Sequence, residues 1–174
     1  CWMEAPGGSP GLSIAAKALS TGALLGARGN SGVILSQMLR GTSDVLGALP
    51  EGEALGADAV LALLRRAADL GYEAVARPVE GTILTVARAA ADAAQASLQA
   101  GADDAATVVQ AGVQGARDAL ALTPTMRESL RLAGVVDAGG QGLLVVLDAL
   151  AEVGSGGRRS GASSTTGLHL PVPR

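Results

Sequence analysis

The chain has 174 residues and a formal net charge of −3 at pH 7, and 48% of its residues are hydrophobic while only 1% are aromatic. This length and composition predict one domain with an apolar core, and an acidic balance without aromatic platforms argues against nucleic acid as a partner. Cys1 is the only cysteine, which excludes an intrachain disulfide, and charged residues interrupt the apolar runs, so we expect a cytoplasmic protein with no membrane span.

Apolar residues recur at helical spacing along most of the chain, and no alternating pattern typical of a strand occurs. The predicted helices cover, in chain order, residues 13–25, 31–46, 54–76, 83–99, from Asp103 or Asp104 to about 122, 124–132 and 143–153. The short helix would begin with Thr123 as N-cap and Pro124 at its first position. Because the connections are short, these helices predict an all-α antiparallel bundle.

The two ends of the chain differ in composition from the middle. Residues 1–11 are rich in Pro and Gly and are predicted to be an irregular N-terminal remnant of a truncated protein. Residues 154–174 are of low complexity, and we predict a disordered tail because they cannot bury enough apolar surface. The predicted helical domain is therefore 12–153.

The connection between the first two helices, GARGNSG at residues 26–32, contains three glycines. Glycine lets the backbone approach an anion closely, and the free N–H groups of the following helix attract phosphate. Asn30 or Ser31 is the predicted N-cap, and Arg28 adds a positive charge. The alternative is a plain helix–turn–helix connection, which spacing alone favours because glycine-rich turns are common.

Two further connections combine glycine with a polar or acidic residue. Residues 77–82 read RPVEGT, where Pro78 disfavours helix before it and Thr82 suits the N-cap of the next helix. Residues 134–142 read GVVDAGGQG and precede the last predicted helix. Alternate connections of an up-and-down bundle lie at one end, and the third joins the first two there if the short helix has only a turn or two.

Three segments together resemble one known family: GALLGARGNSGVILSQMLRG at 22–41, RPVEGTILTVARAA at 77–90 and AGVVDAGGQGLLVVLDAL at 133–150. Their order and spacing are similar to the nucleotide-binding (L-type) domain of the dihydroxyacetone kinase, or glycerone kinase, family. The closest branch resembles the N-terminal domain of the bacterial fatty acid kinase catalytic subunit. The resemblance implies an antiparallel helical barrel that binds ATP through its helix-connecting loops at one end.

The resemblance also implies which residues contact ATP or ADP. They form three groups, one in each connection: Asn30, Ser31 and Gly32; Gly81 and Thr82; and Asp137, Ala138, Gly139 and Gly140. Two of them have a purely structural alternative, since Thr82 is a good N-cap in any protein and Asp137 could cap the last helix. No catalytic residue is assigned.

The family transfers the γ-phosphoryl group of ATP to an acceptor on a partner subunit, which is a lipid-binding or a ketose-binding protein. This implies a kinase, a transferase that uses ATP and Mg²⁺, and the chain could also form a homodimer. The family's metal-binding aspartates precede these motifs, whereas residues 1–11 contain Glu4 and no Asp. We therefore expect the metal ligands upstream of this chain, and little or no kinase activity from the chain alone. The alternative is a non-catalytic nucleotide-binding or partner-docking module.

Arg127 and Arg131 form a further pair of interest because they stand four residues apart. Like charges at this spacing repel slightly on a helix. The two could meet an acidic partner or the nucleotide phosphates, but a solvated pair is the favoured interpretation.

Overall fold

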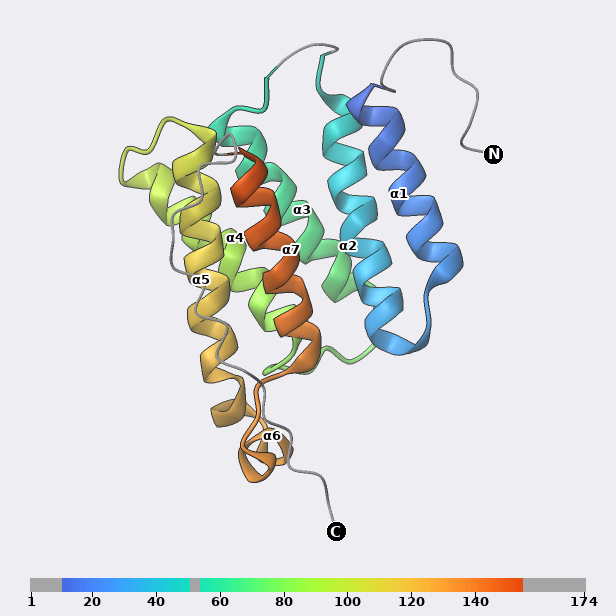
Figure 1. Ribbon diagram of the computed structural model, residues 1–174, viewed down its shortest axis with the longest axis vertical. Helices are drawn as coiled ribbons and strands as arrows, with labels where there is room; N and C mark the ends of the chain where they lie inside the picture. The colour runs from blue at the N-terminus through green and yellow to red at the C-terminus, as the bar shows by residue number, and fades with distance from the viewer. Residues whose placement is uncertain (1–10, 51–53, 155–174) are drawn as a thin grey trace.

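The computed structural model describes residues 11–50 and 54–154, which form α-helices and contain no strand (Figure 1). The helices are α1 (Leu12–Gly26), α2 (Gly29–Ala48), α3 (Ala57–Glu73), α4 (Ile83–Gln99), α5 (Ala105–Met126), α6 (Glu128–Ala133) and α7 (Ala138–Gly154). Successive long helices run antiparallel, and α6 lies beyond one end of the bundle (Figure 1). The all-α antiparallel prediction is confirmed for the described residues, whereas 1–10 and 155–174 lie outside them.

Two predicted helix starts are confirmed by capping hydrogen bonds. The Thr82 side chain accepts the N–H of Leu84 at 3.3 Å, and the Asp104 side chain accepts the N–H of Thr107 at 2.9 Å. Each bond satisfies an N–H group that has no partner within the helix. The bounds of α4 are those predicted, and α3 is three residues shorter than predicted at each end.

The start of α2 corrects the prediction for the first connection. The helix begins at Gly29 rather than at Ser31, and its N-cap is Arg28, which makes no side-chain capping bond. Gly29 has φ of +64°, so the chain turns into the helix at this glycine. Asn30 and Ser31 therefore lie in the first helical turn, and the prediction that one of them is the N-cap is wrong.

The structure also corrects the break predicted at Thr123 and Pro124, because α5 continues through both residues. Proline has no N–H to donate to the carbonyl oxygen four residues earlier, which here belongs to Leu120. The Thr123 hydroxyl donates to that oxygen at 2.8 Å instead, so the carbonyl keeps a partner. The chain leaves the helix only at Arg127, whose backbone is extended (φ −133°, ψ 116°).

The last helix starts five residues earlier than predicted, because α7 begins at Ala138 and includes the following glycines. The Asp137 side chain accepts the N–H of Gly140 at 2.8 Å, which is a capping bond. A Cβ atom on Gly140 would lie 2.8 Å from the Cγ2 of Val86 on α4. The glycine run that resembles a break is therefore a place where α7 packs closely on α4.

The apolar core lies between α2, α3, α4, α5 and α7. One cluster joins α4, α5 and α7 through Val86, Ala90, Val113, Ala116, Leu120, Leu144, Leu147 and Ala151. Small residues form the contact between α4 and α5, which we call the α4–α5 seam: Ala89, Ala90, Ala93, Ala94, Gly112 and Gly115. Small side chains let the two helix backbones approach closely, which fixes α5 relative to α4.

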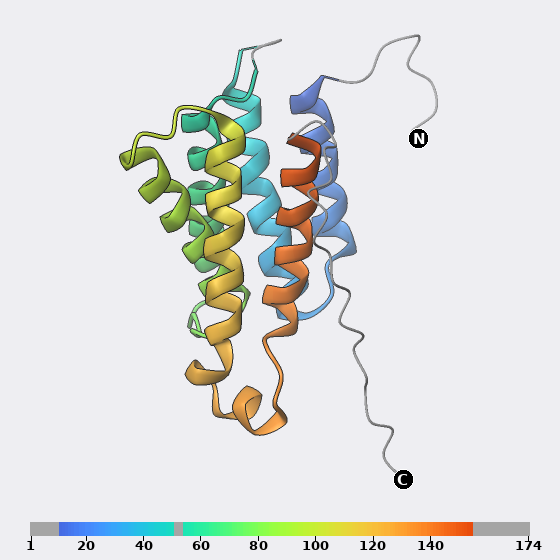
Figure 2. The same ribbon diagram turned by 60° about the vertical axis from the view of Figure 1, so that its left-hand side comes forward.

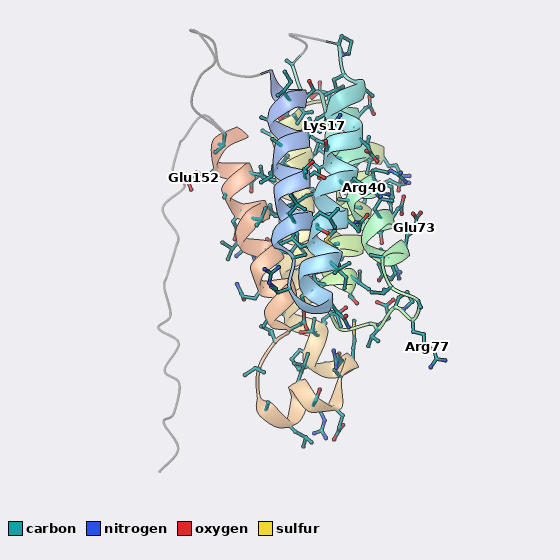
Figure 3. All side chains as sticks on the ribbon, turned by 90° about the vertical axis from the view of Figure 1, so that its right-hand side faces the viewer. Lys17, Arg40, Glu73, Arg77 and Glu152 are labelled. Carbon is teal, nitrogen blue, oxygen red and sulfur yellow. The ribbon has the colours of Figure 1, made fainter. Side chains whose placement is uncertain are left out.

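Helix α1 packs along α2 at the edge of the molecule (Figures 1 and 2). Ser20 is its one buried residue, and its large apolar side chains at Leu12, Ile14, Leu19, Leu24 and Leu25 are exposed. Figure 3 views this edge, where Lys17 marks α1 and Arg40 marks α2. Among the described helices, none combines the length and the apolar character that a membrane crossing requires.

Candidate functional site

Three connections meet at one end of the bundle: α1–α2, α3–α4 and α6–α7 (Figure 1). A cavity of about 230 Å³ lies at this end. Its wall includes Asn30 and Ser31 from α2, Thr82 before α4 and Asp137 before α7. Four of the sequence-predicted site residues, which are far apart in the chain, therefore line one cavity.

The other predicted contact residues lie beside the cavity without lining it: Gly32, Gly81, Ala138, Gly139 and Gly140. Gly32 lies in the first turns of α2, where a Cβ atom would be 3.3 Å from the Cα of Ala27. The last three residues form the first turn of α7. Their contacts with a nucleotide stay a prediction, and their visible role is in packing and in helix starts.

Thr123 joins the third connection to α5. Its hydroxyl is fully buried and accepts the N–H of Asp137 at 3.1 Å while donating to Leu120. The Thr123 hydroxyl thus replaces the helix hydrogen bond that Pro124 cannot make, and it also fixes the backbone of Asp137, which lines the cavity. The sequence pattern predicted Thr123 as an N-cap instead, and the signal for its actual role is the position of a hydroxyl side chain directly before a proline.

The second connection is fitted against the same end of α5. Gly81 has φ of +75°, and a Cβ atom there would lie 2.8 Å from both the Cβ of Met126 and the Cγ of Arg127. Both the backbone angle and the close approach therefore require glycine. The Gly81 N–H donates to the Thr85 hydroxyl at 2.8 Å, and that hydroxyl donates to the Glu80 carboxylate at 2.6 Å.

Glu80 is the centre of a wider hydrogen-bonded group. Its carboxylate also accepts the Tyr72 hydroxyl at 3.1 Å and pairs with Arg88 at 3.2 Å, and the Arg88 guanidinium lies 3.8 Å from the Tyr72 ring centroid. The Thr85 hydrogen bond is the main cause that lowers the pKa of Glu80, while burial and the nearby Glu80 charge raise the pKa of Tyr72 to about 12. A carboxylate with a lowered pKa is a weak proton acceptor near neutral pH, so Glu80 acts as a structural anion.

The cavity wall also carries two arginines from separate connections, Arg77 and Arg127. Within residues 11–50 and 54–154, neither has a hydrogen bond or an ion pair with another side chain, whereas Arg131 pairs with Glu128. The Arg77 side chain extends away from the bundle (Figure 3), and Arg127 is half-buried. Arg131 is exposed, as the solvated-pair interpretation expects, whereas Arg127 is half-buried and lines the cavity, so the two residues have different surroundings.

The lining residues fit a phosphate group better than an apolar ligand. Asn30, Ser31 and Thr82 bring polar side chains, the first turn of α2 has no side-chain cap on its N–H groups, and the half-buried Arg127 is positive. The volume of about 230 Å³ lies below the roughly 300–1,000 Å³ of whole small-molecule sites. The cavity therefore suits the polyphosphate end of a nucleotide rather than all of it.

The fit to a metal ion is more limited. Asp137 is the acidic residue among those that line the cavity, and the described residues contain no cluster of three or more His, Cys, Asp or Glu placed to hold a metal. Mg²⁺ commonly binds through one or two carboxylates together with substrate phosphates and water. Asp137 alone therefore fits as one ligand of a phosphate-bound Mg²⁺.

A second hollow, an open groove of about 340 Å³, lies between α3 and α4 and is lined by Arg65, Tyr72 and Arg88 among others. Its arginines already have partners, because Arg65 pairs with Asp92 at 2.7 Å and Arg88 pairs with Glu80. None of the three motif connections supplies its walls except through this Glu80 contact. The smaller cavity is therefore the candidate site.

A family model and several curated proteins match most of this chain. The DAK2 domain model matches residues 4–152. Protein YloV of Bacillus subtilis is 46% identical over 131 residues, which cover 75% of this chain and 23% of that protein. An uncharacterized protein of Staphylococcus saprophyticus is 44% identical over 130 residues, with the same two shares, 75% and 23%. The chain thus spans about a quarter of the length of the curated relatives it matches.

Proposed function

Because this chain belongs to the DAK2 domain family, which includes ATP-dependent kinases, we propose that it is the nucleotide-binding domain of a dihydroxyacetone-kinase-like phosphotransferase. The observation that carries the proposal is the cavity where Asn30, Ser31, Thr82 and Asp137 meet from three separate connections. In the proposed complex ATP or ADP binds at this end with its phosphates toward α2.

Each part of the cavity has a proposed task. The uncapped N–H groups of α2 and the side chains of Asn30 and Ser31 bind phosphate oxygens. The Thr82 and Gly81 connection, held by Thr85, lies along the nucleotide. Asp137, fixed by Thr123 and Gly140, faces the phosphates from the third side and takes a share of the Mg²⁺ coordination. Bound Mg²⁺ supplies charge neutralisation at the phosphates, and the metal ligands beyond Asp137 are expected outside the described residues.

The proposed acceptor is held by a partner protein, as a fatty acyl carboxylate on a lipid-binding subunit or as dihydroxyacetone on a ketose-binding subunit. The curated relatives are about four times longer than the matched segment. The acceptor and the partner are therefore proposals for the complete phosphotransferase, in which this domain would bind and orient ATP.

The first experiment is isothermal titration of the chain with ADP, with and without millimolar Mg²⁺. We expect saturable binding, and we expect Asn30→Ala or Ser31→Ala to weaken it by about tenfold, the loss of one hydrogen bond to a charged group. Ser13→Ala, in the first turn of α1 at the far end of the bundle, is the matched control and leaves the affinity unchanged. A wild-type chain that shows no saturable binding overturns the proposal.

One observation favours a second candidate, a non-catalytic nucleotide-binding or partner-docking module. The cavity offers one carboxylate, at Asp137, and metal-assisted phosphoryl transfer depends on neutralising the charge of the phosphates. The two candidates differ in turnover rather than in binding. ATP consumption by the chain in the presence of an acyl or ketose acceptor and Mg²⁺ would rule out the second candidate.

A further inference from the structure

Arg127 occupies the junction between α5 and α6, at the edge of the cavity. Its extended backbone is the C-cap of α5 and the N-cap of α6, and its N–H donates to the Thr123 carbonyl at 3.2 Å. The aliphatic part of its side chain lies over Gly81, where a Cβ atom would be 2.8 Å from the Arg127 Cγ. The backbone and the stem of Arg127 are therefore held, and the residue lines the cavity.

The surroundings of Arg127 set it apart from most other arginines of the described residues. Arg65, Arg66, Arg88, Arg117 and Arg131 each pair with a carboxylate. Arg127 is half-buried, lines a cavity and pairs with no carboxylate of the part of the chain that the structure describes. A partly desolvated guanidinium without an anion is costly, and an anionic ligand in the cavity would remove that cost.

We propose that Arg127 binds the polyphosphate of the nucleotide, so that the end of α5 is a fourth element of the site beside the three motif connections. This inference rests on the proposed function, because it names a residue that reads the phosphates in the same cavity. A guanidinium binds phosphate through two parallel N–H groups, which a lysine cannot reproduce. Arg127 also balances Asp137, whose negative charge on the same wall opposes phosphate binding.

Phosphate recognition by Arg127 is distinguishable from a structural role, because it depends on the number of phosphates in the ligand. Arg127→Met keeps an aliphatic stem over Gly81 and removes the charge. Arg131→Met removes an arginine of the same segment that pairs with Glu128 and does not line the cavity, so it is the matched control. The ligands are ADP, AMP and adenosine, titrated separately without Mg²⁺, and far-ultraviolet circular dichroism checks the fold of each variant.

We expect Arg127→Met to weaken ADP binding by about tenfold or more, in line with a charge-assisted hydrogen bond. The effect should shrink for AMP and vanish for adenosine, and Arg127→Lys should recover only part of it. Arg131→Met should bind all three ligands like the wild type. Equal ADP affinity of the wild type and Arg127→Met, or an equal loss for adenosine, overturns the Arg127 contact alone. A wild type that binds none of the ligands overturns the proposed function and this contact with it.

Discussion

The α4–α5 seam and helix α1 are opposite solutions to packing a chain that has hardly any aromatic residues. α4 buries seven residues, and the alanines and glycines of the seam bring its backbone against α5. α1 buries Ser20 alone and leaves its leucines exposed. Apolar burial is therefore concentrated in α2, α3, α4, α5 and α7, and α1 is attached through α2.

The same difference divides the candidate site. The connections around Gly81 and Asp137 are bonded or packed against the end of α5. Asn30 and Ser31 come from the start of α2, which is joined to α1 and makes no side-chain capping bond. The cavity therefore has two walls that are held against the end of α5 and one wall at the start of α2, the helix on which α1 packs.

The largest expected contrast is between two leucines. Leu70 on α3 is 1% exposed and Leu19 on α1 is 59% exposed. Leu70→Ala should lower the free energy of unfolding by about 2–5 kcal/mol because it leaves a cavity in the core. Leu19→Ala should change it by less than about 0.5 kcal/mol. Urea denaturation measures both, and a similar loss for the two variants would show that α1 is buried in solution.

A pair of glycine substitutions should move stability in opposite directions. A Cβ atom on Gly115 would lie 2.4 Å from the Ala93 Cβ and 2.7 Å from the Ala89 carbonyl oxygen, whereas a Cβ atom on Gly22 of α1 meets nothing within 4 Å. Gly115→Ala should cost about 1–3 kcal/mol through overpacking. Gly22→Ala should stabilise by up to about 1 kcal/mol, the helix-propensity difference. The denaturation midpoint of each variant, compared with the wild type at unchanged m-value, measures both effects. A stabilising Gly115→Ala would contradict the close approach of α4 and α5.

Thr123→Val tests the link between α5 and the α6–α7 connection. It keeps the side-chain shape but removes the partner of the Asp137 N–H and of the Leu120 carbonyl, so we expect a loss of about 1 kcal/mol. Hydrogen exchange of the Asp137 amide should become faster, while that of Ser31 stays the same. Thr123→Ser retains the hydroxyl and should restore slow exchange at Asp137, and a failure of this rescue would assign the effect to packing.

The smallest expected effect on stability comes from the ionisable pair beside the α3–α4 connection, Tyr72 and Glu80. The pKa of Tyr72 is raised from 10.0 to about 12, so its contribution is fully present below pH 10 and is lost as the pH rises toward 12. The pKa of Glu80 is lowered from 4.5, so its contribution is present above pH 4.5 and is lost as the pH falls below its folded value.

Tyrosinate absorbance reports Tyr72 directly because the chain has one tyrosine. Glu80→Gln should lower the pKa of Tyr72 toward 10, since it removes a negative charge and replaces a charged hydrogen-bond acceptor with a neutral one. Burial, the main cause of the shift, remains in this variant, so the pKa should stay above 10. An unchanged midpoint would mean that the Tyr72–Glu80 hydrogen bond is absent in solution.

Sequence patterns predicted the features of this fold that are decided locally. Thr82 and Asp104 start helices through their own side chains, so the starts of α4 and α5 could be read from the sequence. Gly140 and Pro124 are standard breaking signals, yet both lie inside helices because a distant or preceding residue compensates. Gly140 fits against Val86, and the Thr123 hydroxyl replaces the bond that Pro124 cannot make.

The candidate site was predictable only in part, because some of its features depend on tertiary packing rather than on local sequence. The motif segments point to Asn30, Ser31, Thr82 and Asp137, and these line one cavity. Arg127 has no motif signal, and its place at the cavity depends on the packing of the end of α5 against Gly81. Thr123 likewise acts through a hydrogen bond to a residue fourteen positions away. Such partners are set by tertiary packing, which no local pattern contains.

The α4–α5 seam has a mechanical consequence. Alanine and glycine have no side-chain rotamers, so the contact between the two helices has no adjustable parts. Sliding one helix along the other would drive Cβ atoms into the backbone of its neighbour. The two helices should therefore move as one rigid body that extends from Thr123, near the cavity, to the α4–α5 connection at the other end. A displacement of the cavity end of this rigid helix pair therefore also moves its other end, because side-chain rearrangement in the seam does not take it up.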